Sequence, residues 1–147
     1  MGMSAREMLA RMIRCEAEGE GVDGMKAVAT VIMNRVHAPH GEYLRVCQGD
    51  LRKVLSQACQ FTCYKTRVAG QQNLQNIFNM TPEAIHYEVA DWALGGNIHW
   101  PVAECLWYMN PFNPNCPQAF PYNGTGYFYT RINQHCFYRP TPLYRET

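Results

Sequence analysis

The sequence predicts an α+β domain in two lobes, with a helical N-terminal half and a small antiparallel sheet in the C-terminal half. Up to about residue 95, apolar residues recur at the three- and four-residue spacing of helices that bury one face. Beyond residue 97 the chain is rich in aromatic and β-branched residues bounded by Pro, Asn and Gly, as strands are. Because 147 residues suit one compact domain, we expect a single domain over 1–147.

The first helix should begin after Ser4 and end near Gly19. Ser4 and Glu7 have the spacing of a capping box, in which the hydroxyl binds an amide of the first turn and the Glu side chain returns the bond. Leu9 and Ile13 then mark its buried face. The later elements follow in order: a helix over 23–36 capped by Asp23, a short helix over 50–58, a Gln- and Asn-rich loop over 69–80, a helix that starts at Thr81-Pro82-Glu83 and closes at Gly95-Gly96, and strands over 106–109 and 127–132.

The composition limits the classes of partner. The net charge of +1 gives no reason to expect nucleic acid or an anionic membrane as partner. No stretch is apolar and long enough to span a bilayer, and Arg6, Arg11 and Arg14 interrupt any apolar run of the kind a secretory signal needs. We therefore expect a protein made in the cytoplasm, with no nucleic-acid partner and no membrane span.

Glu16 is the first candidate catalytic residue. It lies seven, four and three residues beyond Leu9, Met12 and Ile13, so it continues the buried face of the first helix. Burial disfavours the ionised form and would raise the pKa of the carboxyl group towards neutrality, as a general acid needs. The alternative is a Glu that reaches the surface or pairs with Arg14 or Arg35.

Glu20 is the second candidate, because glycosidic cleavage often uses two carboxylates across a cleft. The alternative is that Glu16, Glu18 and Glu20 form a solvated acidic turn. Sugar rings pack on aromatic rings, and their hydroxyls need polar partners. The candidate glycan-binding residues are Phe61, Trp107, Tyr108 and Asn110, and the alternative for Phe61 and Trp107 is a place in the core.

The seven cysteines leave at least one outside any intramolecular bridge. A cytoplasmic origin favours reduced thiols, so we expect mainly reduced cysteines, with Cys116–Cys136 as the most plausible bridge if one forms. Cys59 and Cys63 would be about 13 Å apart in an extended segment, too far for a disulfide. A zinc site from these two cysteines with His135 and Cys136, or a cysteine nucleophile with His135 as base, has little support because no paired CxxC motif is present, and we expect no metal.

Several motifs occur together along this chain. The first is Glu16-Ala17-Glu18-Gly19-Glu20-Gly21, followed by Gly24 and by Val28 to Val36 ending in Asn34-Arg35-Val36. This motif resembles the opening of the SleB/CwlJ cell-wall hydrolases, the spore cortex-lytic enzymes of endospore-forming bacteria. Later landmarks occur in the family's order, and some of them point to the CwlJ branch, which consists of the catalytic domain alone. These are Gln57 with Phe61, His99-Trp100-Pro101, Trp107-Tyr108, and the run from His135 to Thr141.

The resemblance implies a lysozyme-like fold for a single catalytic domain without a cofactor. It also implies cleavage between N-acetylmuramic acid and N-acetylglucosamine in cortex peptidoglycan, a glycan that contains muramic δ-lactam, during germination. In the SleB branch the reaction resembles lytic transglycosylation with one acid/base Glu, which corresponds to Glu16. CwlJ-like members are made in the mother cell without a signal peptide and lie at the boundary of spore coat and cortex, often with a coat-protein partner.

This chain departs from the family pattern at two positions. Ala58 follows Gln57 where relatives often have Pro, and Glu18 stands where the SleB branch often has Arg. A second negative charge near Glu16 could raise its pKa further or indicate that another carboxylate is used. The alternatives are therefore a muramidase-type hydrolase, an N-acetylmuramoyl-alanine amidase, and a non-enzymatic spore-coat scaffold.

Overall fold

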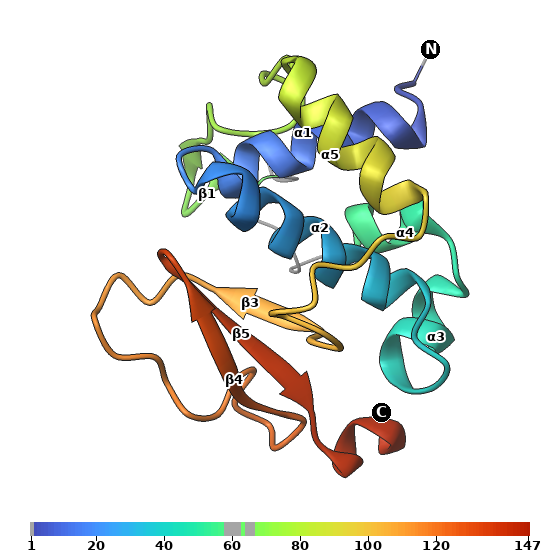
Figure 1. Ribbon diagram of the computed structural model, residues 1–147, viewed down its shortest axis with the longest axis vertical. Helices are drawn as coiled ribbons and strands as arrows, with labels where there is room; N and C mark the ends of the chain where they lie inside the picture. Colours follow the sequence, from blue (N-terminus) through green and yellow to red (C-terminus); the bar gives the residue numbers. More distant parts are fainter. Residues whose placement is uncertain (1, 58–62, 64–66) are drawn as a thin grey trace.

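The structure, a computed structural model, describes residues 2–57, 63 and 67–147. Figure 1 shows helices α1, α5, α2 and α4 gathered in one half of the molecule and the strands β3, β5 and β4 in the other. This arrangement confirms the α+β prediction of a helical N-terminal half and an antiparallel sheet in the C-terminal half. The predicted boundaries of the elements are right in some places and wrong in others.

Helix α1 (Ala5–Ala17) begins after Ser4 as predicted, but among the described contacts only the Ser4 half of the predicted capping box forms. The Ser4 hydroxyl accepts a hydrogen bond from the Glu7 amide at 3.1 Å, while the Glu7 carboxylate accepts one from Arg11 Nε at 2.8 Å. Helix α2 (Gly21–Val36) starts earlier than predicted. Its N-cap is Glu20, and Asp23 lies in the first turn, so the predicted cap at Asp23 is wrong.

Two of the following helices were expected and one was not. Helix α4 (Leu51–Ser56) is capped by Asp50, whose carboxylate accepts a hydrogen bond from the Arg52 amide at 2.8 Å. Helix α5 (Ala84–Leu94) starts later than predicted, with Glu83 as its N-cap, and the Glu83 amide donates a hydrogen bond to His86 Nδ1 at 2.9 Å. Helix α3 (Gly41–Cys47) was not predicted.

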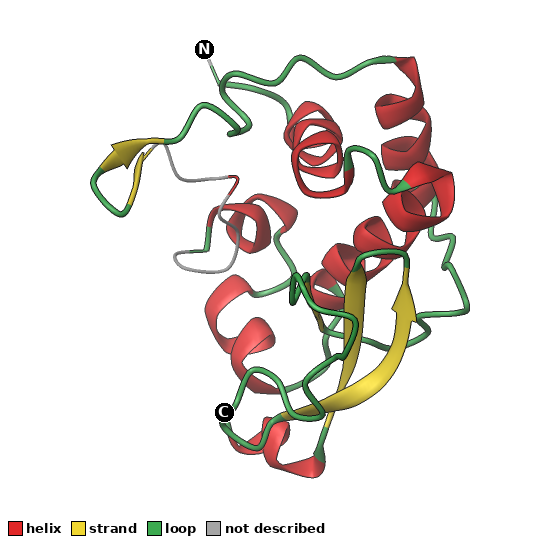
Figure 2. Ribbon diagram, turned by 90° about the vertical axis from the view of Figure 1, so that its left-hand side faces the viewer, coloured by secondary structure: helices red, strands yellow, loops and turns green. Residues whose placement is uncertain are grey.

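The larger sheet has three described strands, β3 (Trp107–Met109), β4 (Gly126–Ile132) and β5 (His135–Pro140), all antiparallel in the order β3-β5-β4. The sequence predicted the two outer strands and missed β5, the central one. A small hairpin of β1 (Arg67–Val68) and β2 (Gln71–Gln72) occupies part of the expected loop and stands away from the helices in Figure 2. The chain closes with a short 3-10 helix (Pro142–Glu146).

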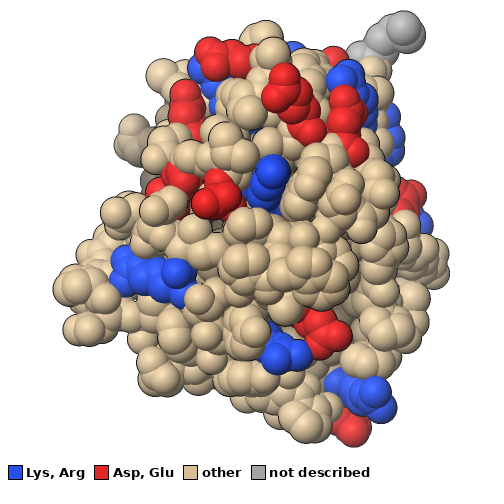
Figure 3. Space-filling model, viewed as in Figure 1, with Lys and Arg blue, Asp and Glu red and all other residues tan. Residues whose placement is uncertain are grey.

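Helix α2 joins the two halves because it is apolar on nearly all sides. Val28 and Ile32 pack in the large core that α2 shares with α1, α4 and α5. Ala27 and Val31 face the other way and pack with Phe137 of the central strand. Within the described residues, no helix combines the length and apolarity that a membrane span needs. On the face in Figure 3, charged side chains lie in small separate groups, the acidic ones mostly over the helical half.

Candidate active site

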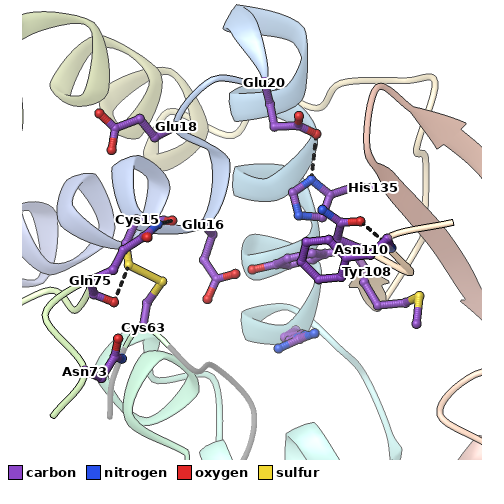
Figure 4. A pocket seen from close by; sticks show the side chains of 13 residues that line it. Cys15, Glu16, Glu18, Glu20, Cys63, Asn73, Gln75, Tyr108, Asn110 and His135 are labelled. Carbon is purple, nitrogen blue, oxygen red and sulfur yellow. Dashed lines mark hydrogen bonds and ion pairs between the residues drawn. A yellow bond between two sulfur atoms is a disulfide. The ribbon is translucent and has the colours of Figure 1, made fainter. Parts of the chain in front are cut away.

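A cavity of about 590 Å³ lies between the end of α1, the start of α2 and the strands β3 and β5. Figure 4 shows Glu16, Glu20, Tyr108 and His135 around it. Both candidate catalytic residues and two of the four candidate binding residues, Tyr108 and Asn110, line this one cavity. The fold therefore brings together side chains that are up to 119 positions apart in the sequence.

The position of Glu16 follows from the packing of α1. Leu9 and Ile13 are fully buried, and Glu16 continues their face into the cavity. Just beyond it, Gly19 and Gly21 adopt φ values of +87° and +76°, which residues with a Cβ rarely adopt. These two glycines let the chain reverse between α1 and α2, so that Glu16 and Glu20 face the same cavity.

The Glu16 carboxyl group is the strongest acid candidate in the cavity. Its side chain is partly exposed, but the Oε1 atom is out of contact with solvent and makes no hydrogen bond with any described residue. Burial raises the pKa of Glu16 to about 6. The Tyr108 hydroxyl, the Cys63 backbone amide and the positive charge of Arg35 all act in the opposite direction, and burial outweighs them.

Arg35 and Tyr108 form the floor of the cavity beside Glu16. The Arg35 guanidinium group is buried, donates to the Leu106 carbonyl at 2.7 Å, and lies 6.0 Å from the centre of the Tyr108 ring. Burial raises the pKa of Tyr108 well above its ordinary value, and the nearby Glu16 charge raises it further. Its hydroxyl therefore stays protonated and points towards the Glu16 carboxyl group in Figure 4.

Glu20 is also largely buried, with 10% of its side chain exposed, but it differs from Glu16 in its hydrogen bonds. Its Oε1 atom accepts from the Gln134 amide at 3.1 Å and lies 2.8 Å from His135 Nδ1. Any other residue at position 24, one turn after Glu20 in α2, would place its Cβ 2.5 Å from the Glu20 Cβ. Position 24 therefore requires glycine. Glu20 is the N-cap residue of α2, but its side chain turns to the β4–β5 turn, so the alternative of a solvated acidic turn is wrong for Glu20.

Glu18 does not account for the raised pKa of Glu16. Its side chain is about half exposed, lies 3.4 Å from Arg14 as an ion pair, and is directed away from Glu16 in Figure 4. The suggestion that the charge of Glu18 raises the pKa of Glu16 is therefore wrong, since burial is the cause. The Glu18 carboxylate therefore has its charge partner in Arg14.

The candidate glycan-binding residues lie in different places. Trp107 is buried in the core, with its ring centre 5.6 Å from that of Tyr144, and does not line this cavity. Asn110 lines the cavity, and its Oδ1 atom accepts a hydrogen bond from the Phe112 amide at 2.8 Å. Phe61 lies outside the described residues. The sequence analysis missed Phe112, which lines the cavity with 89% of its surface exposed.

More cysteines form disulfides than we expected. The structure contains disulfides Cys15–Cys63 and Cys116–Cys136, so the expectation of mainly reduced cysteines is wrong, while the choice of Cys116–Cys136 as the most plausible bridge is confirmed. The free thiols among the described residues, Cys47 and Cys105, are buried. Because Cys63 and Cys136 are bonded to other cysteines, neither has a thiolate for the zinc site considered with Cys59, which lies outside the described residues.

A buried carboxylic acid with a pKa near neutrality in an open cavity is the arrangement of an acid–base catalyst, so the class that fold and site define is an enzyme. The model of the family described as Cell Wall Hydrolase matches residues 19–138. The chain belongs to this family, as its resemblance to the SleB/CwlJ enzymes implied. The match includes Glu20, Tyr108, Asn110 and His135 but begins three residues after Glu16.

Relatives and solved structures agree with this assignment. The chain is 30% identical to the cell wall hydrolase CwlJ of Bacillus subtilis over 92% of its own length and 84% of the relative's. It is 26% identical to the cell wall hydrolase CwlJ of Oceanobacillus iheyensis, also over 92% of its length. The catalytic domain of the germination-specific lytic transglycosylase SleB from Bacillus anthracis has the same fold, with a TM-score of 0.62 and 23% identity over 93% of this chain and 95% of that one.

Proposed function

We propose that this enzyme cleaves the glycan strand of spore cortex peptidoglycan between N-acetylmuramic acid and N-acetylglucosamine during germination, as a lytic transglycosylase. The observation that carries the proposal is the Glu16 carboxyl group, whose buried oxygen and raised pKa suit it to donate a proton. The likeness to proteins named as a cell wall hydrolase and a germination-specific lytic transglycosylase supports the choice of substrate and reaction.

In the proposed reaction, Glu16 protonates the glycosidic oxygen while the bond to the muramic acid C1 atom breaks. The 6-hydroxyl of the same muramic residue then bonds to C1 and loses its proton to a base, giving an anhydromuramic end. In the simplest scheme that base is the Glu16 carboxylate left by the first step. A muramidase-type hydrolase would instead activate water, and Glu20 is the second carboxylate of the cavity.

Polar and aromatic side chains around the cavity mouth suit a glycan strand. Phe112 offers a ring face to solvent, and Asn110, Asn73 and Gln75 also line the cavity. A sugar ring could pack its C–H face on Phe112 while its hydroxyls bind the amides. The Tyr108 ring packs against His135 and Phe137, so we propose that Tyr108 acts through its hydroxyl beside Glu16.

The test is to incubate the purified protein with decoated spores or cortex fragments and to identify the new ends by mass spectrometry. We expect anhydromuramic ends, while reducing muramic ends would show hydrolysis, and free stem peptides would show an amidase. Glu16→Gln should lower the rate at least about 100-fold without lowering the melting temperature. Glu7→Gln, the same change on the same helix outside the cavity, is the control. A Glu16→Gln variant with full lytic activity would refute the assignment.

The proposed place of action is the boundary of spore coat and cortex, where a coat protein would hold the enzyme after synthesis in the mother cell. This proposal rests on the resemblance to the CwlJ branch. Fractionation of spore layers with an antibody against the chain should recover it in the coat extract. Recovery from the spore core alone would contradict the proposed location, and normal recovery from spores lacking their coat proteins would contradict the coat-protein partner.

A further inference from the structure

One of the two disulfides lies in the wall of the cavity, next to the proposed acid. Cys15 directly precedes Glu16 near the end of α1, and its sulfur is bonded to that of Cys63, 48 residues further along the chain. Both cysteines line the cavity, and Figure 4 shows their bridge beside Glu16. The other disulfide, Cys116–Cys136, is not among the described residues that line this cavity.

Cys63 reaches the acid through its backbone. Its amide donates a hydrogen bond to the Glu16 carboxylate, which favours the ionised form and opposes the effect of burial on the pKa. Its carbonyl accepts a hydrogen bond from the Ile77 amide at 2.9 Å, and its sulfur is bonded to Cys15. The position of the Cys63 amide is therefore set by the disulfide together with two hydrogen bonds.

We propose that Cys63 is a positioning residue of the active site and that the Cys15–Cys63 disulfide makes the activity of this enzyme depend on its redox state. The bridge holds the Cys63 amide on the Glu16 carboxylate, and reduction of the bridge releases that amide. The inference rests on the proposed function, because it names the contact that prepares the acid for its reaction. It leaves both proton transfers to Glu16.

A residue that serves as both acid and base needs support for its charged form. Glu16 is a carboxylate from the moment it protonates the leaving oxygen until it takes the proton of the muramic 6-hydroxyl. Because the group is buried, that charge depends on fixed donors, and these are the Cys63 amide, the Tyr108 hydroxyl and the positive charge of Arg35. Of the three, only the amide is held by a bond that a thiol can break.

The contacts on the α1 side of the bridge do not depend on the disulfide. Gln75 Nε2 donates to the Cys15 carbonyl at 3.2 Å, and Arg11 Nη1, one turn earlier, donates to the Ile77 carbonyl at 2.8 Å. Reduction leaves these bonds in place and takes from Cys63 its covalent link to α1. Hydrogen bonds alone then hold Cys63 among the described residues, and water replaces such bonds at little net cost.

The reduction is a thiol–disulfide exchange. A thiolate attacks one sulfur of the bridge, the bond between the two cysteine sulfurs breaks, and a mixed disulfide forms. A second thiolate releases it, so the protein gains two electrons and two protons while two small thiols become one small disulfide. An oxidised small disulfide reverses the exchange. Since a cytoplasm keeps thiols reduced, the enzyme should be least active where we propose that it is made.

The kinetic test compares oxidised and reduced protein on soluble cortex glycan fragments. Peptide mass spectrometry should first find Cys15 bonded to Cys63 in the oxidised enzyme, and free thiols at both positions in active enzyme would overturn the inference. Dithiothreitol should lower kcat about tenfold at pH 5 and leave KM within about threefold. Oxidised glutathione should restore kcat.

The pH profile is the readout that a merely structural bridge would not move. The acid form of Glu16 is lost as the pH rises through about 6. Without the Cys63 amide the carboxylate is less favoured, so reduction should raise this midpoint by about one pH unit. The new thiols ionise near pH 8.5, above this range. Reduction changes no charge on the other titratable groups that line the cavity: Glu18, Glu20, Arg35, Tyr108 and His135.

Two double variants assign the effect to one bridge. Cys15→Ser/Cys63→Ser should have the kcat and the pH midpoint of the reduced enzyme and should not respond to dithiothreitol. Cys116→Ser/Cys136→Ser, which lacks the other disulfide, is the matched control and should keep the full response. If reduction lowers the melting temperature but leaves kcat and the midpoint unchanged, the bridge is only structural and the inference fails while the proposed function stands.

NMR of the oxidised protein tests the contact without reduction and without activity. The Cys63 amide signal should move with pH around a midpoint of about 6, because its hydrogen bond strengthens as Glu16 ionises. In Glu16→Gln this movement should be absent. A Cys63 signal that does not move would overturn the inference even if the reduced protein does not fold. If the oxidised enzyme releases no glycan fragments, the proposed function fails, whatever the Cys63 signal does.

Discussion

The end of α1 and the start of α2 each present a largely buried carboxylate to the same cavity, and their surroundings differ. Glu16 has a buried oxygen without a hydrogen bond to any described residue, and its pKa is raised to about 6. Glu20 has an oxygen that meets both the Gln134 amide and His135. Burial alone therefore does not assign a role to a carboxylate. The hydrogen bonds available to it decide whether it can release a proton or holds a neighbour in place.

The largest effect that would test this comparison is the pH dependence of cleavage. Only the protonated form of Glu16 can act as an acid, and that form is lost as the pH rises through about 6. The rate should therefore fall by about tenfold per pH unit well above this value, or about 50-fold between pH 6 and pH 8. Initial rates of fragment release across this range check the prediction, with Glu104→Gln as a surface control that keeps the same profile. A rate that is constant up to pH 8 would show that Glu16 is not the acid.

The second prediction is that the two carboxylates affect stability in opposite directions. The folded state holds the Glu16 proton more tightly than the unfolded chain, so ionisation above about pH 6 costs the folded state about 1–2 kcal/mol. Glu16→Gln removes this cost, so its free energy of unfolding relative to that of the wild type should be higher at pH 8 than at pH 4. Glu20→Gln should lose about 1–3 kcal/mol at pH 8, because it weakens charge-assisted hydrogen bonds. Urea unfolding of both variants at pH 4 and pH 8 measures the two effects. If both variants were less stable than the wild type at pH 8, the comparison would be wrong.

The smallest expected effect comes from the cavity mouth, which should contribute binding and no proton transfer. Phe112→Ala should raise KM about two- to tenfold, the range for one aromatic contact, and leave the pH profile unchanged. Trp100→Ala removes another exposed ring, 71% exposed and outside the cavity, and should leave KM as it is. Equal effects of the two substitutions would show that the glycan does not rest on Phe112.

The sequence predicted those features that depend on neighbouring residues. Leu9, Met12 and Ile13 repeat at helical spacing, and this spacing is enough to place Glu16 on the buried face of its helix. Ser4 caps its helix as expected, because a cap is made with amides two or three residues away. The strand β5 was missed for a related reason. His135 to Tyr138 are all buried, so this central strand has no alternation of polar and apolar residues to reveal it.

Tertiary structure alone decided which distant residues meet. Nothing near Glu20 in the sequence indicates that its carboxylate binds Gln134 and His135, and nothing near Cys15 indicates that it pairs with Cys63, 48 residues on. Such contacts depend on how the β4–β5 turn and Cys63 lie against the end of α1 and the start of α2. The sequence by itself thus determined most of the helices, the general division into two halves and the place of Glu16 on the buried face of its helix. Packing between elements far apart in the chain determined the partners of Glu20, since it alone sets long-range distances.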